Sequence, residues 1–337
     1  MRRTEFDLCR IYACLFILLV HTGADIYHEL PLESASFFAV SFLSTMSRSA
    51  LPLFFMISGA LQLSREKMDP MRVLKHSVLR LTGMFYLWSL LYALARAASG
   101  AFGGSYDFLY AVVAGHYHLW FLPAMAVVCM FLPVAHAALH GGGLDGRYIL
   151  GLFFFLGIFL ANCNLTPFPA PVLYRFTQNF SLDYLPYLGY AVWGWWLSKK
   201  EFPCRTLWLA PLVFLLVTLL ATLANRWYSL SRGDADGWLF SHFSLPGFLQ
   251  TTCSFCFFLA LKGKKLRHEK LVTELSACTL GVYLLHPLML NVFERVGLAV
   301  TPALPVLSLL GVYVCLAVMC FALVYLLRRV PLLNRIF

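Results

Sequence analysis

The sequence predicts an all-α fold, a polytopic membrane helix bundle formed by a chain of 337 residues. Hydrophobic residues make up 60% of the chain and charged residues only 12%, whereas a soluble domain carries about 25% charged residues. The mean hydropathy is +0.74, and the apolar residues form continuous runs of nearly span length. Such runs are typical of membrane helices, because barrel strands alternate apolar and polar positions. A helix bundle is therefore the expected architecture.

Ten apolar runs are candidate transmembrane helices. They lie near residues 9–28, 37–63, 81–98, 118–139, 148–163, 183–198, 206–224, 244–262, 276–293 and 304–327. We read the first run as a retained span rather than a cleaved signal peptide, because no convincing small-residue cleavage site follows it. An even number of spans places both termini on one side. No composition shift or internal repeat divides the chain, so residues 1–337 are predicted to form one membrane domain.

Lysine and arginine are distributed unevenly between the two sides of this bundle. Of the 26 such residues, about 20 fall at the termini, at the entry to the first run or in alternate connections, which predicts that both termini are cytoplasmic. The net charge of +10 therefore indicates membrane orientation and contact with anionic lipids rather than nucleic-acid binding. The cations toward the other side are Arg48, Arg96, Arg175, Arg226, Arg232 and Arg295.

The ten cysteines do not form a disulfide framework, because most lie within the spans, where a thiol acts as a small hydrophobe. Cys253 and Cys256 have the spacing of a redox motif. They lie in an apolar run with no neighbouring βαβ pattern, so we expect neither a redox role nor a metal site.

The second run, residues 37–63, is too long for one straight helix. Pro52 is predicted to kink or break it, because the proline ring clashes with the preceding turn. A broken helix at membrane depth is tolerated where it lines a cavity.

Arg10 and His21 are the most informative pair in the chain. Eleven residue steps along a helix bring His21 to within roughly 20° of the direction of Arg10 and raise it by about 16 Å. One helix face would then carry a cation near the surface and an imidazole deep in the membrane, where ionisable groups usually have a function. This arrangement suits a long anionic cofactor whose reactive end reaches inward.

His21 is the candidate catalytic base of this face. An imidazole accepts and returns protons near neutral pH, and Asp25, four residues later, is predicted to orient it on the same helical face. Transfer of an acyl group to a hydroxyl requires such a base. The alternative is a buried histidine whose ring nitrogens are satisfied by a backbone carbonyl or a neighbouring helix.

A basic connection at residues 64–80 precedes the third run. Arg80 enters that run and, with Lys75, is a candidate for binding phosphate oxygens. The alternative is that these cations only set the membrane orientation. The chain contains no P-loop, dinucleotide fingerprint or nucleophile elbow, so ATP hydrolysis and α/β-hydrolase chemistry lack support.

Four residues toward the outer side are candidates for binding a second substrate. His118 and Trp120 lie where an outer loop enters the fourth run, and His286 lies just before Pro287 in the ninth. Arg48 is the fourth. For His118 and Trp120, the alternative is a surface histidine beside an interfacial aromatic anchor. For His286, it is packing at a proline bend.

The chain resembles the acyltransferase-3 family of integral membrane acyltransferases over essentially its whole length. Within the family it is most similar to the enterobacterial common antigen O-acetyltransferase branch, through SRxxxPLFFMISG and YHLWF. The motifs that carry the resemblance, in order, are FDLCRIYACLFILLVH (6–21), SRSALPLFFMISGAL (47–61), YHLWFLPAMAVVCMFLPV (117–134) and TLGVYLLHPLML (279–290).

The resemblance implies a ten-span bundle that takes an acyl group, usually acetyl, from cytoplasmic acyl-coenzyme A. The acceptor it implies is a hydroxyl of a cell-envelope glycan, often lipid-linked, at the bacterial inner membrane. The family's essential arginine and histidine match Arg10 and His21, and its Asp-x-x-Arg start matches Asp7 and Arg10. Many members carry Arg-x-x-Arg at the third span. Here Arg80 matches the second arginine, but Ser77 stands in place of the first.

Two other functions remain open at this stage. A transporter or flippase for a glycan precursor or a small acidic substrate would also use a broken helix and buried ionisable residues, although it should show inverted repeats. A membrane sensing domain is the other, and no fused catalytic module is seen to support it. For the acyltransferase, acetyl-coenzyme A is the expected co-substrate. The expected partners are a glycan acceptor and membrane lipids, and the sequence does not decide the oligomeric state.

Overall fold

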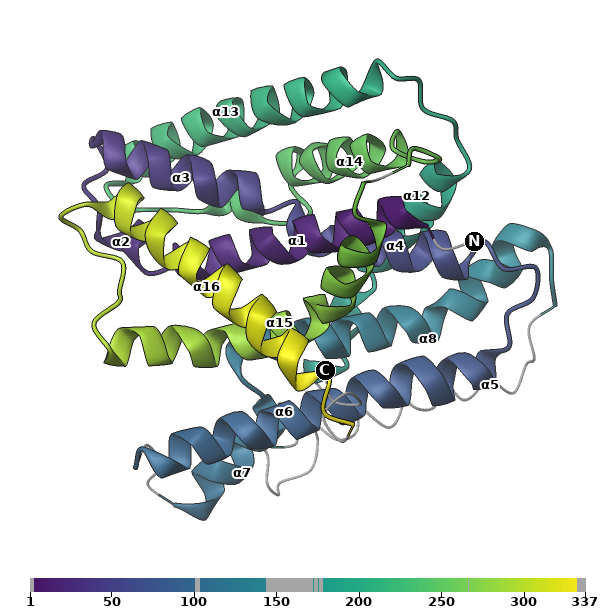
Figure 1. Cartoon of the computed structure of the whole chain (residues 1–337), viewed down its shortest axis with the longest axis horizontal. Helices are drawn as coiled ribbons and strands as arrows, with labels where there is room; N and C mark the ends of the chain where they lie inside the picture. The colour runs from purple at the N-terminus through teal and green to yellow at the C-terminus, as the bar shows by residue number, and fades with distance from the viewer. Residues whose placement is uncertain are drawn as a thin grey trace. The chain divides into compact units, whose positions relative to one another are not determined.

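The computed structural model describes residues 3–100, 104–143, 172, 175, 178–265 and 267–331. These residues form helices joined by short connections, and no strand occurs among them (Figure 1). The all-α prediction is therefore confirmed for the described part of the chain. The predicted span at 148–163 lies outside the described residues.

The chain divides into two compact units, Met1–Phe54 with Leu197–Phe337, and Phe55–Trp196. It passes from one to the other within α4 (Ala50–Gln62) and again within α12 (Tyr187–Ser198). The other helices of the first unit are α1 (Thr4–Thr22), α2 (Ile26–Glu29), α3 (Ala35–Ser47), α13 (Thr206–Arg232), η5 (Trp238–Phe240), α14 (Leu245–Leu259), α15 (Glu269–Arg295) and α16 (Pro305–Leu327). Those of the second are α5 (Pro70–Val73), η1 (Leu74–Val78), α6 (Leu79–Ala98), α7 (Ser105–Ala114), η2 (Tyr117–Trp120), α8 (Phe121–His140) and η4 (Leu182–Tyr184).

Seven helical segments of the described chain are long and apolar enough to cross a membrane. They are Thr4–Glu29, Ala35–Gln62, Pro70–Ala98, Tyr117–His140, Thr206–Arg232, Glu269–Arg295 and Pro305–Leu327. Two further predicted spans correspond to shorter helices, α12 with 12 residues and α14 with 15, against about 20 for a full crossing. The count of ten and the cytoplasmic termini therefore stay predictions.

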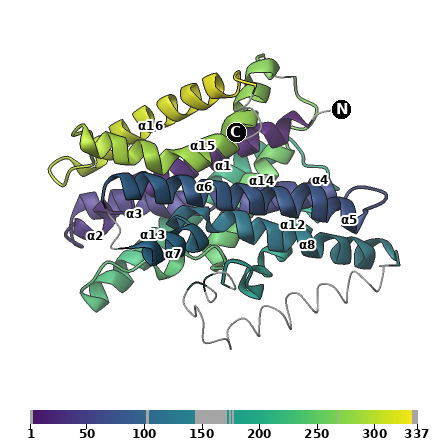
Figure 2. The same ribbon diagram turned by 90° about the horizontal axis from the view of Figure 1, so that it is seen from below.

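Helix α1 is the centre of the first unit. It packs against α3, α14, α15 and α16, and α15 and α16 lie side by side (Figures 1 and 2). A core of mostly small and branched apolar side chains joins α1, α15 and α16. Its buried members are Cys14, Leu18, Cys278, Val282, Phe293, Val312, Leu316, Cys320 and Val324.

The local sequence explains where α1 begins and ends. Glu5 and Asp7 lie in its first turn, where negative charge complements the positive end of the helix dipole. Gly23 follows the last turn, and its N–H bonds to the carbonyl of Leu19. The 19-residue helix between these signals is uninterrupted, so Arg10 and His21 lie on one helix as predicted.

The predicted break of the second span is confirmed. Helix α3 ends at Ser47 and α4 begins at Ala50, with Arg48 and Ser49 in a turn between them. Pro52 lies in the first turn of α4, where the missing N–H removes no intrahelical hydrogen bond. The proline therefore ends one helix and permits the next to start two residues before it.

Two glycines permit close contact between α4 and α12 in the second unit. A Cβ atom added at Gly59 would lie 1.8 Å from the carbonyl oxygen of Ala191, and one added at Gly194 would lie 2.3 Å from that of Met56. Small residues of this kind let membrane helices approach backbone to backbone. This contact fixes how α12 packs although the helix is short.

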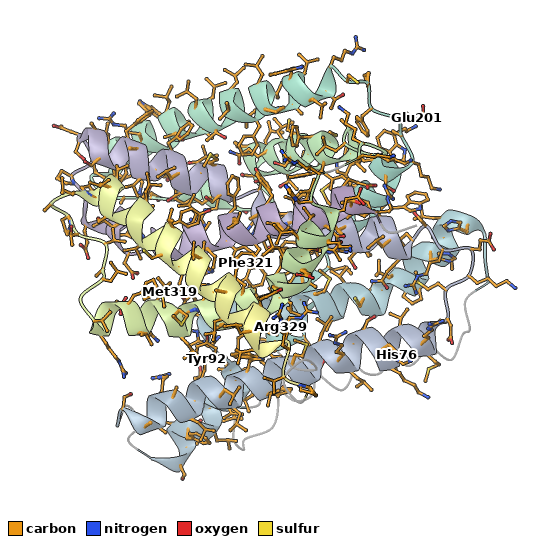
Figure 3. The ribbon with its side chains drawn as sticks, in the orientation of Figure 1. His76, Tyr92, Glu201, Met319, Phe321 and Arg329 are labelled. Carbon is orange, nitrogen blue, oxygen red and sulfur yellow. The ribbon has the colours of Figure 1, made fainter. Side chains whose placement is uncertain are left out.

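Helices α13 and α16 keep broad apolar faces exposed. Only 28% of the most apolar 18-residue stretch of α13 is buried, and 22% of that of α16. Met319 on α16 is among the exposed side chains (Figure 3). An apolar surface of this extent on helices of span length is the surface expected to contact lipid.

We expect Gly59→Ala to destabilise the protein by about 1–3 kcal/mol or more, because the added methyl group would overlap the backbone of α12. The measurement is thermal unfolding of the purified protein in detergent. Gly189→Ala on α12 is the matched control, since nothing lies within 4 Å of its Cβ position. Equal melting temperatures for the two variants would contradict the close contact.

Candidate functional site

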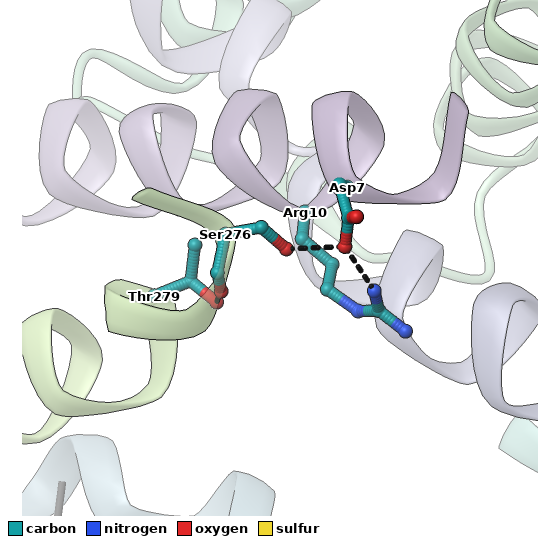
Figure 4. A network of polar contacts seen from close by, with 4 residues as sticks. All are labelled: Asp7, Arg10, Ser276 and Thr279. Carbon is teal, nitrogen blue, oxygen red and sulfur yellow. Dashed lines mark hydrogen bonds and ion pairs between the residues drawn. The ribbon is translucent and has the colours of Figure 1, made fainter. Parts of the chain in front are cut away.

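The polar cluster at the start of α1 joins that helix to α15. Arg10 Nη1 donates to Asp7 Oδ1 at 2.9 Å, and Ser276 Oγ donates to the same oxygen at 2.8 Å (Figure 4). Thr279 Oγ1 in turn donates to the carbonyl of Ser276. Asp7 is only 1% exposed, and the two hydrogen bonds give its buried oxygen the partners that a buried polar atom needs. Asp7 therefore holds the Arg10 guanidinium in a defined position.

Helix α15 accompanies α1 from this cluster to its far end. Cys14 Sγ contacts the carbonyl of Thr279, and the rings of His21 and His286 lie 4.9 Å apart between centroids. The residue numbers of the contacting pairs increase together along the two helices, so α1 and α15 run parallel. One helix pair thus carries a guanidinium at one end and two imidazoles at the other.

The hydrogen bond of His286 shows which of its ring nitrogens carries the hydrogen. Its Nδ1 lies 2.7 Å from the carbonyl oxygen of Tyr283. Because a carbonyl can only accept, Nδ1 carries the hydrogen, and in the neutral ring Nε2 has the lone pair. His286 was predicted to contact a second substrate. The structure places it in the core of α15, fully buried, beside the predicted base.

The orienting role of Asp25 loses its geometric basis. The prediction required α1 to continue to residue 25, but the helix ends at Thr22, and Asp25 directly precedes α2 without a side-chain capping hydrogen bond. Asp25 is exposed, and the i,i+4 relation with His21 is not formed. The structure places the ring of His286 beside that of His21, and no spacing in the sequence indicated this contact.

Lys75 and Arg80 belong to the second unit. Lys75 lies in η1, a single π-helical turn, and Arg80 is the second residue of α6 (Figure 3 labels the neighbouring His76). Both side chains are exposed. Turns of this type occur mostly as insertions in α-helices and often mark functional sites. The segment where Ser77 replaces the family's first arginine is therefore irregular in structure too.

His118 is not a surface residue, contrary to the alternative for the loop entry. It is 2% exposed, and its Nδ1 lies 2.9 Å from Nδ1 of His116. Burial and the nearby Arg96 lower the pKa of His116 to about 4, so the His116 ring is neutral at physiological pH and shares one hydrogen with the ring of His118. The ring of Trp120 packs against those of Tyr184 and Tyr187, with a centroid-to-centroid distance of 6.0 Å to each.

Arg48 lies in the turn between α3 and α4. Its Cζ is 4.4 Å above the ring of Phe240, and its Nε is buried without a hydrogen-bond partner. His242 lies close enough for the two charges to interact: burial and Arg48 lower the pKa of His242 to about 4. Arg48 was predicted from the sequence as a candidate site residue, but its neighbours Phe240 and His242 were not. These two residues lie about 190 positions away along the chain, so no local pattern indicates the contact.

Cys253 and Cys256 are free thiols on α14. Ser276, which the sequence analysis did not select, binds Asp7 across 269 positions of sequence. A lone serine in an amphipathic stretch carries no signal of such a contact.

Comparison with known proteins gives two matches. The family model described as an acyltransferase domain matches residues 3–329. A protein named amino-acid racemase from Enterococcus faecalis is 26% identical over 323 residues, which cover 88% of this chain and 42% of that protein. The chain thus spans less than half the length of this relative. No solved structure matches the chain.

We expect Arg10→Gln to destabilise the protein by about 1–3 kcal/mol, because it leaves the buried Asp7 carboxylate without the guanidinium that pairs with it. Asp7→Asn should cost less, because Arg10 is partly exposed to water. The double variant Asp7→Asn/Arg10→Gln should recover part of the loss. Additive losses in thermal unfolding would show that the two groups do not interact.

Proposed function

Because the chain belongs to the acyltransferase-3 family, whose domain spans residues 3–329, we propose that it transfers an acetyl group from cytoplasmic acyl-coenzyme A to a cell-envelope glycan. The family and the apolar helices make the protein a multi-pass membrane acyltransferase. We further propose that the donor carries an acetyl group and that the acceptor is a glycan hydroxyl, free or on a lipid-linked precursor. We also propose that the protein lies in the bacterial inner membrane and belongs to the common-antigen branch of the family.

The observation that carries the proposal is the α1–α15 pair. Arg10, fixed by Asp7 and Ser276, lies near the start of α1, and His21 lies in its last turn beside His286. About 16 Å of helix separates Arg10 from His21. Coenzyme A is long and carries its phosphates at the end opposite the thioester. A guanidinium that binds phosphate and an imidazole that meets the thioester therefore fit its two ends.

The second unit offers further phosphate ligands. Lys75 and Arg80 are exposed cations on and just after the π-helical turn. Arg80 is the arginine that matches the family motif. We assign these two side chains to phosphate groups of the donor.

His21 is proposed as the general base of the reaction. Its ring takes the proton of the acceptor hydroxyl while the hydroxyl oxygen attacks the thioester carbonyl. The C–S bond then breaks, and the thiolate of coenzyme A takes the proton back from the imidazolium. His286, whose Nδ1 is held by the Tyr283 carbonyl, is a positioning residue that fixes the neighbouring ring.

A relay through His21 is the second route. The imidazole nitrogen attacks the thioester, coenzyme A leaves, and the acceptor hydroxyl then takes the acetyl group from the ring. This route lets the acetyl group pass to an acceptor that never shares a cavity with the donor. Rapid-quench labelling without acceptor distinguishes the routes, because only the relay accumulates acetylated protein.

The racemase relative does not alter the proposal. Racemisation is the activity named for that whole protein, and the chain covers 42% of it. The proposal therefore rests on the family.

We expect His21→Gln to lower acetyl transfer about 100-fold or more, because the proton of the acceptor hydroxyl loses its base. The measurement is the acetyl increment on envelope glycans by mass spectrometry, with protein level and melting temperature as controls for folding. His28→Gln, an exposed histidine on α2, should retain activity. Normal acetylation by a folded His21→Gln protein would remove the chemical role.

We expect loss of the Arg10 guanidinium to raise the KM for acetyl-coenzyme A about tenfold with a smaller change in kcat, because binding of the donor phosphates weakens. The test uses Asp7→Asn/Arg10→Gln, in which no unpaired carboxylate remains. Arg3→Gln is the matched control, since Arg3 and Arg10 side chains are similarly exposed, 27% and 28%. An unchanged KM would contradict the docking role.

A further inference from the structure

Two segments that interrupt the α-helices meet in the first unit. One is the Arg48–Ser49 turn, which interrupts the candidate span Ala35–Gln62 near its middle. The other is the connection 233–244 between α13 and α14, whose Phe240 ring lies beneath the Arg48 guanidinium. The side chain of Thr251 on α14 reaches the carbonyl of Ser49. Irregular backbone within a membrane span is tolerated where it is buried in protein or lines a cavity.

Two helices begin at these interruptions. Helix α4 begins at Ala50, directly after the turn, and α14 begins at Leu245, directly after the connection. The first N–H groups of a helix form a partial positive charge. In membrane proteins with interrupted helices, such N-termini bind anionic groups of substrates.

Arg48 is a cation without an anion. Among the described residues, no carboxylate forms an ion pair with it and no acceptor bonds its guanidinium. The aromatic ring of Phe240 lies against it, and the Tyr27 hydroxyl and the imidazole of His242 are near enough to interact with it electrostatically. The Tyr27 hydroxyl already donates to the carbonyl of Asp236.

A guanidinium held in this way is costly. Desolvation of an ion is offset only when a counter-charge or hydrogen bonds replace the lost water, and a face-on aromatic ring replaces part of it. Intramembrane arginines that remain uncompensated therefore mark substrate sites. His242 stays neutral at physiological pH, because burial and Arg48 lower its pKa to about 4, and a neutral imidazole can donate to an oxyanion.

We propose that Arg48, the neighbouring His242 and the N-terminus of α4 form a binding subsite for an oxyanion of the acceptor, a carboxylate or a phosphate. The guanidinium binds the oxyanion by charge-assisted hydrogen bonds, and the ring of Phe240 covers the opposite face of the guanidinium. The inference rests on the proposed function and narrows its acceptor to anionic glycans or phosphate-linked glycan precursors.

The two sources of the oxyanion are separable by small probes. Glucuronate presents a sugar carboxylate, glucose 1-phosphate presents a sugar phosphate, and glucose is the neutral reference. Binding is measured on the full-length protein in lipid nanodiscs as the ligand-dependent rise in melting temperature, and the dissociation constant follows from its concentration dependence. This readout requires no acyl transfer.

We expect the wild-type protein to be stabilised by one of the two anions and not by glucose. Arg48→Gln should raise the dissociation constant of that anion at least about tenfold, and Arg48→Lys should lose less, since it keeps the charge. Arg232→Gln, which removes an exposed arginine of α13, should bind as the wild type does.

The stability of the unliganded variants separates binding from a structural role. A subsite predicts that Arg48→Gln melts no lower than the wild type, because an unpaired buried charge is removed. A lower melting temperature with unchanged anion binding would overturn the proposal. So would the absence of stabilisation by either anion, or equal binding by Arg48→Gln and the wild type.

The outcome is independent of the proposed reaction. Arg48-dependent anion binding by a protein that transfers no acetyl group would retain the subsite and refute the transferase, favouring a transporter of anionic substrates. Acetyl transfer that depends on His21 but is insensitive to Arg48→Gln, with no anion binding, would retain the transferase and refute the subsite.

Discussion

The Asp7 carboxylate is the group on which the first unit depends. It is buried, and it accepts from both Arg10 on its own helix and Ser276 on α15. A charge in this environment is stable only while its partners remain, so the contact fixes the start of α1 against α15. It also fixes the guanidinium of Arg10, which would otherwise sample many rotamers. The same carboxylate thus positions α1 against α15 and orients the guanidinium proposed to bind phosphate.

The parallel course of α1 and α15 follows from this contact and from the packing above it. Small side chains such as Cys14 and Cys278 allow the helices to stay close through the core. The pair ends at His21 and His286, whose rings lie together. The helix pair thus has a polar group at each end and an apolar core between them.

The interruption of the second span also has a structural consequence for the proposed ligand. A continuous helix would bury its backbone groups and present only side chains, whereas a break frees N–H groups for a ligand. Pro52 accompanies a break three to four residues upstream, at Arg48–Ser49. The connection before α14 then meets the break and brings Phe240 against Arg48. Two local interruptions with different causes, a proline and a long inter-helix connection, therefore produce one polar centre.

The sequence by itself determined the helical class, the membrane character, the single helix that carries Arg10 and His21, and the break at Pro52. These follow from local physics, namely apolar run length, helical periodicity and the proline ring. Only the tertiary structure decided that Ser276 binds Asp7, that His286 rather than Asp25 accompanies His21, and that Phe240 covers Arg48. Such partners come from segments up to 269 positions apart. Which helices become neighbours depends on packing of the whole bundle, and no local pattern records it.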